Sequence, residues 1–514
     1  MRATSLGHAG LLVESGESSI LCDPWFVPAF FGSWFVFPRN DRLSNDLTAK
    51  IESPTYIYIS HIHGDHFDER FLAEHVSRDA KVLLPDYPSR ELERRLTKLG
   101  FKNFLQTKNG VEVALDGQTK IAIHVETSIT DGPGGDSALV VSDAQARLVN
   151  QNDCRTGDLA SLKSHGPVDL HWLQFSGAIW YPMVYDQDEN EKRKLARAKV
   201  ESQFARAMRY VERVDARAVV PSAGPPCFLD EDLFHLNMID GDEVSIFPDQ
   251  TRFLSRLRDI GRHDDILAIP GTSIEISPNK ITVTHPKDAN LDGIFADKEN
   301  YLRQYQKDWA PWLQNEKSNW QSPQTDILST LQAWFEPLLA LAPSLRAAIG
   351  ANCLIRSGES EMLINFESGK VEKFADQNHG FRFDIPRDLL EKIVEERAVD
   401  WSNSFFLSCR FTAWRAGEFN EFIYNFFKSL SVERMIRTEA EAVSRTGGDV
   451  SANDEIELSD YVMQRKCPHR QADLSVFGEI EDGVLTCSLH GWRFNLDDGR
   501  CLNAENRPLK VRRK

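Results

Sequence analysis

The strongest constraint on this chain is a set of two cysteines and two histidines near its C-terminus. The stretch CPHRQADLSVFGEIEDGVLTCSLHGWRF places Cys467 and His469 in one arm and Cys487 and His490 in the other. A structural zinc site usually takes like ligands in each arm. Here each arm supplies one thiolate and one imidazole, which suits a [2Fe–2S] cluster with two thiolates on one iron and two imidazoles on the other. The pattern therefore predicts an electron-carrying cluster, with zinc as the alternative.

The residues around these arms resemble the Rieske domain of oxygenases over Glu455 to Lys514, through the segments Ala472 to Ser475, Gly491 to Phe494, and Asp498-Gly499. Respiratory-chain Rieske proteins carry an extra cysteine beside each arm, and this chain has none there. The resemblance implies a [2Fe–2S] cluster of the oxygenase type, which passes single electrons.

A second metal signature lies in the N-terminal half, in TYIYISHIHGDHFDE. The run from Thr55 to Ser60 is aromatic and β-branched, which predicts a buried strand. It ends in four potential metal ligands, His61, His63, Asp65 and His66. This H-x-H-x-D-H pattern resembles the metallo-β-lactamase fold. In that fold an Asp after a later strand commonly bridges two metals, and Asp153 fits by position. A metal-bound hydroxide assisted by Asp65 would be the hydrolytic use of such a site.

Two ligands of that fold are missing at their usual places. The segment Asp131 to Asp136 holds no His where one is expected, and neither does Ser222 to Pro226 after the predicted strand Ala218 to Pro221. His124, on a strand face opposite apolar residues, and His235, from a following helix, stay open as ligands. A depleted ligand set with open positions favours one iron that binds oxygen over a fully ligated dinuclear zinc site.

Taken together, the two halves resemble the CMP-N-acetylneuraminate hydroxylase family. Further likeness lies in Asp23-Pro24-Trp25, in Asn150 to Cys154, in Phe175 to Met183 and in Pro221 to Gly224. The resemblance implies an α/β chain: an αββα metallo-β-lactamase-like sandwich, a middle α+β region and an all-β Rieske domain. Those hydroxylases carry the Rieske domain at the N-terminus, whereas here it ends the chain, so CMP-sialic acid is not implied as the substrate.

The pattern of apolar and polar stretches predicts five segments. They are a catalytic metallo-β-lactamase-like domain (1–285), a linker (286–325), an α+β domain that resembles sterol-carrier domains (326–438), a hinge (439–454) and the Rieske domain (455–514).

Composition narrows the partners and the compartment. The net charge is 60 − 77 = −17, which argues against nucleic acid, because phosphate binding needs clustered Lys and Arg. No apolar run is long enough to span a membrane, and the start lacks the features of a signal peptide. The eight cysteines show no disulfide pattern. We therefore expect a cytoplasmic protein.

Three functions are compatible with these motifs. The first is a Rieske-dependent monooxygenase that uses O2 and one or two non-haem irons to oxidise a small organic substrate, and by analogy it could be a homo-oligomer. Because no G-x-G-x-x-G follows a predicted strand, an external NAD(P)H-dependent reductase, with or without a ferredoxin or cytochrome, would supply the electrons. The second is a zinc hydrolase with a regulatory Rieske domain, and the third is a non-catalytic redox carrier.

Overall fold

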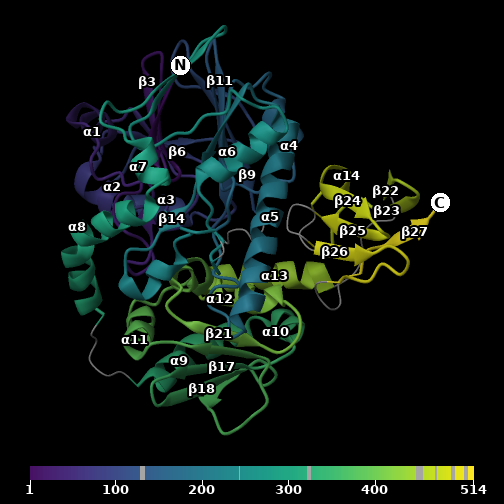
Figure 1. Ribbon diagram of the computed structural model, residues 1–514. Coiled ribbons are helices and arrows are strands. Elements are labelled where there is room, and N and C mark those ends of the chain that lie inside the picture. Colours follow the sequence, from purple (N-terminus) through teal and green to yellow (C-terminus); the bar gives the residue numbers. More distant parts are fainter. Residues whose placement is uncertain are drawn as a thin grey trace. The chain divides into compact units, whose positions relative to one another are not determined.

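The computed structural model describes residues 1–127, 134–241, 243–320, 326–446, 455–468, 472–487, 492–502 and 508–514. They fall into two compact units, the first built from 1–127, 134–178 and 193–313, and the second from 179–192 and 314–514 (Figure 1). None of the helices within these residues is both long and apolar enough to cross a membrane.

The first unit contains two large mixed sheets. The eight-stranded sheet has the order β16-β15-β1-β2-β3-β5-β6-β7 and the six-stranded sheet the order β13-β12-β11-β10-β9-β8. The eight-stranded sheet contains β1 (Arg2–Gly7), β2 (Gly10–Ser15), β3 (Ser18–Cys22), β5 (Tyr56–Tyr58), β6 (Lys81–Leu84), β7 (Phe104–Gln106), β15 (Ser273–Ile276) and β16 (Ile281–Thr284). The six-stranded sheet contains β8 (Val113–Ala114), β9 (Lys120–Glu126), β10 (Asp136–Ser142), β11 (Arg147–Asn152), β12 (Leu170–Gln174) and β13 (Ala218–Ser222). A short pair, β4 (Phe35–Val36) and β14 (Pro226–Cys227), stands apart from both sheets.

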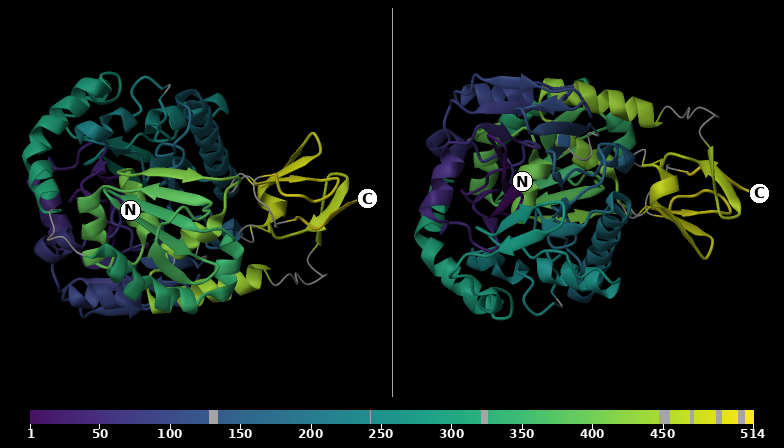
Figure 2. Two further views of the ribbon diagram at one scale, coloured as in Figure 1. Left: turned by 90° about the horizontal axis from the view of Figure 1, so that it is seen from below. Right: turned by 90° about the horizontal axis from the view of Figure 1, so that it is seen from above.

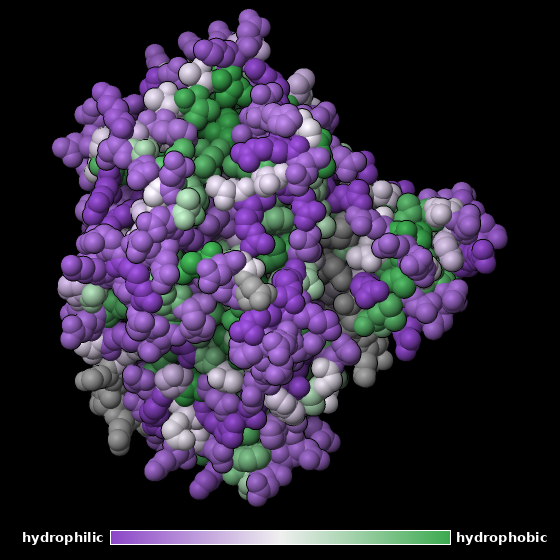
Figure 3. All heavy atoms as spheres, in the orientation of Figure 1, coloured by the Kyte–Doolittle hydropathy of each residue, from purple (hydrophilic) through white to green (hydrophobic). Residues whose placement is uncertain are grey.

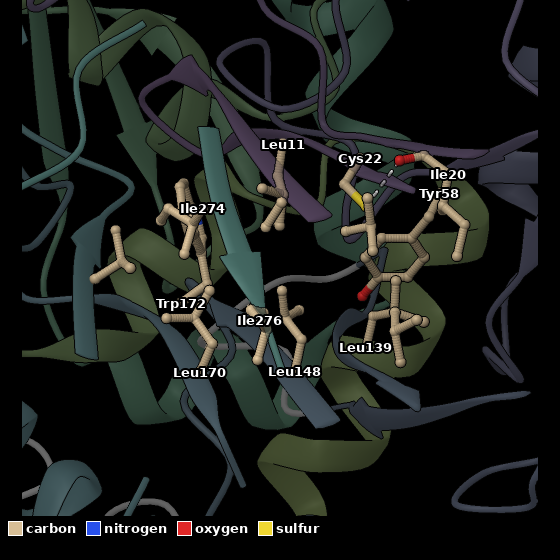
Figure 4. Close-up of a cluster of buried hydrophobic side chains, with 14 of the residues drawn as sticks. Leu11, Ile20, Cys22, Tyr58, Leu139, Leu148, Leu170, Trp172, Ile274 and Ile276 are labelled. Carbon is tan, nitrogen blue, oxygen red and sulfur yellow. Dashed lines mark hydrogen bonds between the residues drawn. The ribbon is translucent and has the colours of Figure 1, made fainter. Parts of the chain in front are cut away.

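Alternation along the strands builds two separate cores. In β2, Leu11 and Val13 point into the core between the two sheets, whereas Leu12 points to the opposite face, because successive side chains of a strand face opposite sides. Figure 4 shows the core between the sheets, where Tyr58 and Ile274 of the first sheet lie near Leu139 and Trp172 of the second. Each large apolar side chain buried in this way contributes about 1.5–3 kcal/mol.

Helices cover the outer faces of both sheets. The outer core of the first sheet contains side chains of α1 (Asn45–Glu52), α2 (Glu69–His75) and α3 (Glu91–Lys98). On the second sheet, Phe175 packs against Phe204 of α5 (Glu189–Val214) and Phe253 of α6 (Gln250–Asp259). The short helix α4 (Leu159–Lys163) precedes β12. Figure 1 shows α1–α3 and α4–α5 on opposite sides of the paired sheets. This arrangement confirms the predicted αββα sandwich.

The predicted linker 286–325 differs from expectation. It contains α7 (Leu291–Phe295) and α8 (Lys298–Ser318), whose Leu302 and Tyr305 are buried in an apolar cluster of the first unit. Phe35 meets Tyr305 and the tryptophans of α8 edge-on. The polar residues of this segment form the exposed face of an amphipathic helix, and its apolar residues, spaced along one face, form the buried side. The spacing of the apolar residues therefore decides the structure here, and the polar composition does not.

The second unit begins with an α+β region. Its five-stranded sheet has the order β19-β18-β17-β20-β21 and is visible in Figure 2. Trp401 stacks on Phe427 in the same region. The elements are β17 (Cys353–Ser357), β18 (Ser360–Asn365), β19 (Lys370–Lys373), β20 (Phe381–Asp384), β21 (Thr412–Arg415), α9 (Ile327–Ala340), α10 (Pro343–Ile349), α11 (Arg387–Glu395), α12 (Glu421–Phe427) and α13 (Val432–Thr446).

The C-terminal part of this unit consists mainly of strands. One three-stranded sheet contains β22 (Glu455–Leu458), β23 (Tyr461–Gln464) and β27 (Val511–Arg513). A second three-stranded sheet contains β24 (Gly478–Glu481), β25 (Val484–Cys487) and β26 (Trp492–Asn495). One short helix, α14 (Leu474–Phe477), joins them. The face drawn in Figure 3 is dominated by hydrophilic residues, in keeping with the charged composition.

His171 gives the first unit a predictable response to acid. This buried residue of β12 lies 2.9 Å through Nε2 from Oε1 of Gln151, and burial, together with the charge of Arg262, lowers its pKa from 6.5 to about 3. Between these values the unfolded chain binds a proton that the folded chain does not, so stability falls as the pH is lowered. At pH 5 we expect a loss of about 2 kcal/mol relative to pH 7 from this residue.

The test is guanidinium unfolding of the full chain at pH 7 and pH 5. His171→Gln should reduce the difference in unfolding free energy between the two pH values by about 2 kcal/mol. His263→Gln, at an exposed position, should leave that difference unchanged. An unchanged difference in His171→Gln would contradict the assignment.

Candidate metal centre

The residues of the H-x-H-x-D-H motif lie where several strands end. His61 follows β5, whose neighbour β3 is parallel to it, and the N–H of Asp23 after β3 donates to the carbonyl of Tyr58 at 3.0 Å. In the other sheet, Asp153 follows β11 and Asp136 begins β10, its antiparallel partner. Strand ends from both sheets therefore bring carboxylates and imidazoles to one edge of the sandwich. We call His61, His63, Asp65, His66 and Asp153 the histidine–carboxylate site.

His66 is oriented by groups on its Nδ1 side. Oδ2 of Asp23 lies 3.3 Å from Nδ1, and Asn152 donates through Nδ2 to the same carboxylate oxygen. The opposite ring nitrogen, Nε2, faces Oδ2 of Asp65 at 3.6 Å and Oδ1 of Asp153 at 3.5 Å. Metal-binding histidines commonly have such a carboxylate partner. It binds one ring nitrogen and thereby directs the other toward the metal.

Asp65 and Asp153 are held in the ionised form. Burial opposes the charge on Asp65, but the imidazoles of His66, His8 and His63 outweigh it and lower the pKa of the carboxyl group. Burial likewise opposes the charge on Asp153, and His66 and His61 lower its pKa. The same carboxylates raise the pKa of His66 well above its usual value, against the effect of burial. Both aspartates can therefore bind a cation at neutral pH.

His61 has a carboxylate partner of its own. Its Nδ1 lies 3.4 Å from Oδ1 of Asp136 and 2.9 Å from the hydroxyl of Ser60. The ring of His63 meets that of His61 edge-on, with 4.3 Å between centroids. Burial raises the pKa of Asp136, opposed by His61. Asp136 thus occupies the region where the sequence lacked a histidine and contributes a carboxylate there instead.

These residues fit a metal ion. Asp23, Asp65 and Asp136 are all buried, and a buried charge is costly unless a partner of opposite charge neutralises it. Among the described residues, Nε2 of His66 and Oδ1 of Asp153 have no hydrogen-bonding partner, although both atoms are buried. The ligand atoms of His61, His66 and Asp153 lie within 4.8 Å of one another. Imidazole and carboxylate ligands together suit iron, manganese or zinc.

The two histidines left open by the sequence lie elsewhere. His124 faces His165, with 2.8 Å between their Nε2 atoms, and His235 is exposed on the short helix Glu231–Leu236. Two residues that sequence reasoning missed do reach the site. Asp136 comes from β10, and His8 lies 3.0 Å through Nε2 from Oδ2 of Asp65. The signal for His8 was its place between two glycines, Gly7 and Gly10.

The C-terminal cysteines occupy the two arms predicted for the cluster. Cys467 is buried, and its N–H donates to the carbonyl of Ala472 at 2.8 Å. Cys487 is also buried and ends β25, where it pairs with Gly478 and Trp492. His469 and His490 lie outside the described residues. Buried thiols at Cys467 and Cys487 have the chemistry that an iron–sulfur cluster requires.

Comparison with known proteins identifies the family. Over its full length the chain is 41% identical to Rv3818 of Mycobacterium tuberculosis (strain H37Rv), which bears the name of a Rieske 2Fe-2S iron–sulfur protein, and the alignment covers 100% of both chains. The chain belongs to the family of this protein. Two family profiles match parts of it: the Rv3818-like, SCP2-like domain over residues 327–444 and the Rieske [2Fe-2S] domain over residues 429–511. The predicted Rieske domain is thereby confirmed.

More distant similarities cover only part of the chain. The cytidine monophosphate-N-acetylneuraminic acid hydroxylase of Danio rerio is 29% identical over 196 residues, 35% of this chain and 30% of that protein. The crystal structure of CmlA, a diiron beta-hydroxylase from Streptomyces venezuelae, aligns at 12% identity with a TM-score of 0.34, covering 55% of this chain and 54% of that one. The resemblance to the sialate hydroxylases is thus partial, and membership lies with the Rv3818-like proteins.

Proposed function

We propose that this Rv3818-like protein is a Rieske-type iron-dependent oxygenase that oxidises a small organic substrate with O2. One observation carries the proposal. A single chain combines a Rieske [2Fe-2S] domain with a buried site of imidazoles and carboxylates that has the ligands for iron. A cluster that carries single electrons can serve a redox-active metal in the same chain, whereas the hydrolytic reaction of a zinc ion consumes no electrons.

Different residues of the chain would hold the cluster and the iron. When bound, the cluster supplies single electrons and iron in the histidine–carboxylate site supplies the activation of O2. Asp23 fixes the ring of His66, and Asp136 fixes the ring of His61. Asp65 has a lowered pKa and its Oδ2 lies 3.0 Å from Nε2 of His8, so we assign it to ligation in preference to proton transfer.

Aromatic side chains keep bulk water away from one side of the site. Trp25 and Trp34 are buried, and both rings lie edge-on to His8, with centroids 4.9 and 6.4 Å away. Low polarity around the buried carboxylates strengthens their attraction for a cation, because electrostatic interactions grow as the dielectric constant falls. The DPW segment that resembles the sialate hydroxylases thus lines the metal site.

We further propose an external NAD(P)H-dependent reductase, with or without a ferredoxin or cytochrome, as the electron donor. The absence of a dinucleotide-binding fingerprint from the sequence supports a separate donor. An amino-sugar derivative is the first substrate class to test, in view of the partial similarity to the sialate hydroxylase.

The test combines metal analysis with oxygen consumption. The protein is purified anaerobically, and iron and zinc are counted per chain. A cluster alone accounts for about two irons, so a count of about three or more with little zinc is expected. Reduced protein should then consume O2 faster when a substrate is added. About two irons with one or two zincs would overturn the proposal and favour a hydrolase with a regulatory cluster. Iron at both sites without O2 consumption would favour a redox carrier.

A further inference from the structure

The turn between β1 and β2 places a histidine in an unusual backbone conformation. His8 has φ = 50°, in the left-handed region that non-glycine residues seldom adopt. Its carbonyl accepts the N–H of Ala223 at 3.0 Å, so the turn lies beside the end of β13. That strand end is where the sequence lacked the last histidine of the fold. Such conformations persist where the surrounding structure enforces them, often at functional sites.

The side chain of His8 points into the site. It is 6% exposed, and its Nε2 lies 3.0 Å from Oδ2 of Asp65. The ring of His66 stands edge-on to it, with 5.7 Å between centroids. The ligand atoms of His8, Asp65 and His66 all lie within 4.8 Å of one another. Two ligands about 2.1 Å from one metal are roughly 3.0–3.5 Å apart, and the contacts of Asp65 with His8 and His66, at 3.0 and 3.6 Å, lie close to that spacing.

The site therefore contains two overlapping ligand groups. One is His8, Asp65 and His66, and the other is His61, His66 and Asp153. An imidazole nitrogen has one lone pair, so Nε2 of His66 can serve only one metal. A carboxylate has two oxygens and can serve two. Asp153, 3.5 Å from His66, is the group that can be shared.

We propose that His8 is a ligand of a second metal position, formed with Asp65 and His66 and joined to the first position by Asp153. The first position is then left with His61, His63 and the other oxygen of Asp153. This inference rests on the proposed function insofar as the histidine–carboxylate site binds metal. It makes the site dinuclear, and it places in the β1–β2 turn the histidine that the fold usually takes from the end of β13.

A rival explanation is that His8 only donates a hydrogen bond that positions Asp65. Two substitutions separate these roles. In His8→Gln the amide NH2 group can still donate to Asp65 but does not bind metal, and the amide oxygen is a weaker ligand than an imidazole nitrogen. In His8→Asp the donor is lost and a ligand oxygen is provided, in a residue type that tolerates a positive φ. His124→Gln is the matched control, since His124 is a largely buried histidine of the same unit that faces His165.

Full-length protein is stripped of metal at the N-terminal site and titrated anaerobically with Mn(II), with bound metal and the EPR signal as readouts. The wild type and His124→Gln should bind two ions per chain and show the signal of a coupled pair. His8→Gln should bind the second ion more than roughly 100-fold more weakly and show the signal of an isolated ion. His8→Asp should restore the pair.

The outcomes that overturn the inference are distinct from those that overturn the proposed function. A coupled pair in His8→Gln, or its loss in both His8 variants, would assign His8 to positioning Asp65. One ion in the wild type would exclude the second position and leave the oxygenase proposal intact. No bound ion in the wild type would overturn both.

Discussion

Asp153→Asn is expected to remove metal from the histidine–carboxylate site while the visible absorption of the [2Fe–2S] cluster remains. The carboxylate of Asp153 lies 3.5 Å from Nε2 of His66, and burial leaves its Oδ1 without a hydrogen-bonding partner among the described residues. An amide keeps the shape and removes the charge. Loss of a residue that only hydrogen-bonds to a metal ligand already lowers metal affinity about 10–100-fold. Loss of a ligand that two metal positions share should therefore lower it more than roughly 100-fold.

The measurement is iron per chain together with O2 consumption by the reduced protein. We expect the iron count to fall to that of the cluster alone, about two per chain, and substrate-dependent O2 consumption to cease. Asp143→Asn is the matched control: this Asp lies at the opposite end of the β10–β11 hairpin and accepts from the hydroxyl of Ser15 at 2.7 Å. Full metal content in Asp153→Asn would remove Asp153 from the site.

Cys487→Ala is expected to remove the cluster and leave the metal of the histidine–carboxylate site in place. It removes a thiolate from the end of β25, and the cluster should be lost with about two irons per chain. The histidine–carboxylate site should retain its metal, because its ligands come from the strands of the other unit. Reduction by an external donor should then no longer support O2 consumption, since the protein lacks its electron carrier.

Visible absorption, iron per chain and donor-driven O2 consumption test this result together. Cys227→Ala is the control, because Cys227 is also buried but belongs to the first unit, where burial raises the pKa of its thiol. Cys227→Ala should keep the cluster. If Cys487→Ala still consumed O2 at the wild-type rate with the same donor, electrons would enter by another route and the oxygenase proposal would lose its basis.

Local sequence was sufficient to predict sites whose ligands lie close together along the chain. The motif from His61 to His66 lies on one strand end, so residue types and spacing alone indicated a metal site there. The same holds for the two arms at Cys467 and Cys487, where the mixture of ligands pointed to an iron–sulfur cluster. The αββα sandwich followed from resemblance and from strand patterns, and the structure confirms it.

Residues contributed from distant strands could not be found in this way. His8 meets Asp65 across 57 positions of the sequence, and Asp23 meets His66 across 43. The predicted linker became a helix for a similar reason, since Tyr305 finds a partner in Phe35. Such contacts depend on which strands pair and on where each turn is placed, and no local pattern records either.

The sequence by itself indicated where potential metal ligands gather, because ligand type and spacing are local properties of the chain. Only the tertiary structure decided how complete the N-terminal site is. Pairing of β1 with β2 and the contact of its turn with Ala223 carry His8 to the place of the missing histidine. Pairing of β10 with β11 sets Asp136 beside His61. The sequence lacked two histidines of the fold, and folding brings His8 and Asp136 close to the site because the ends of separate strands meet at one edge.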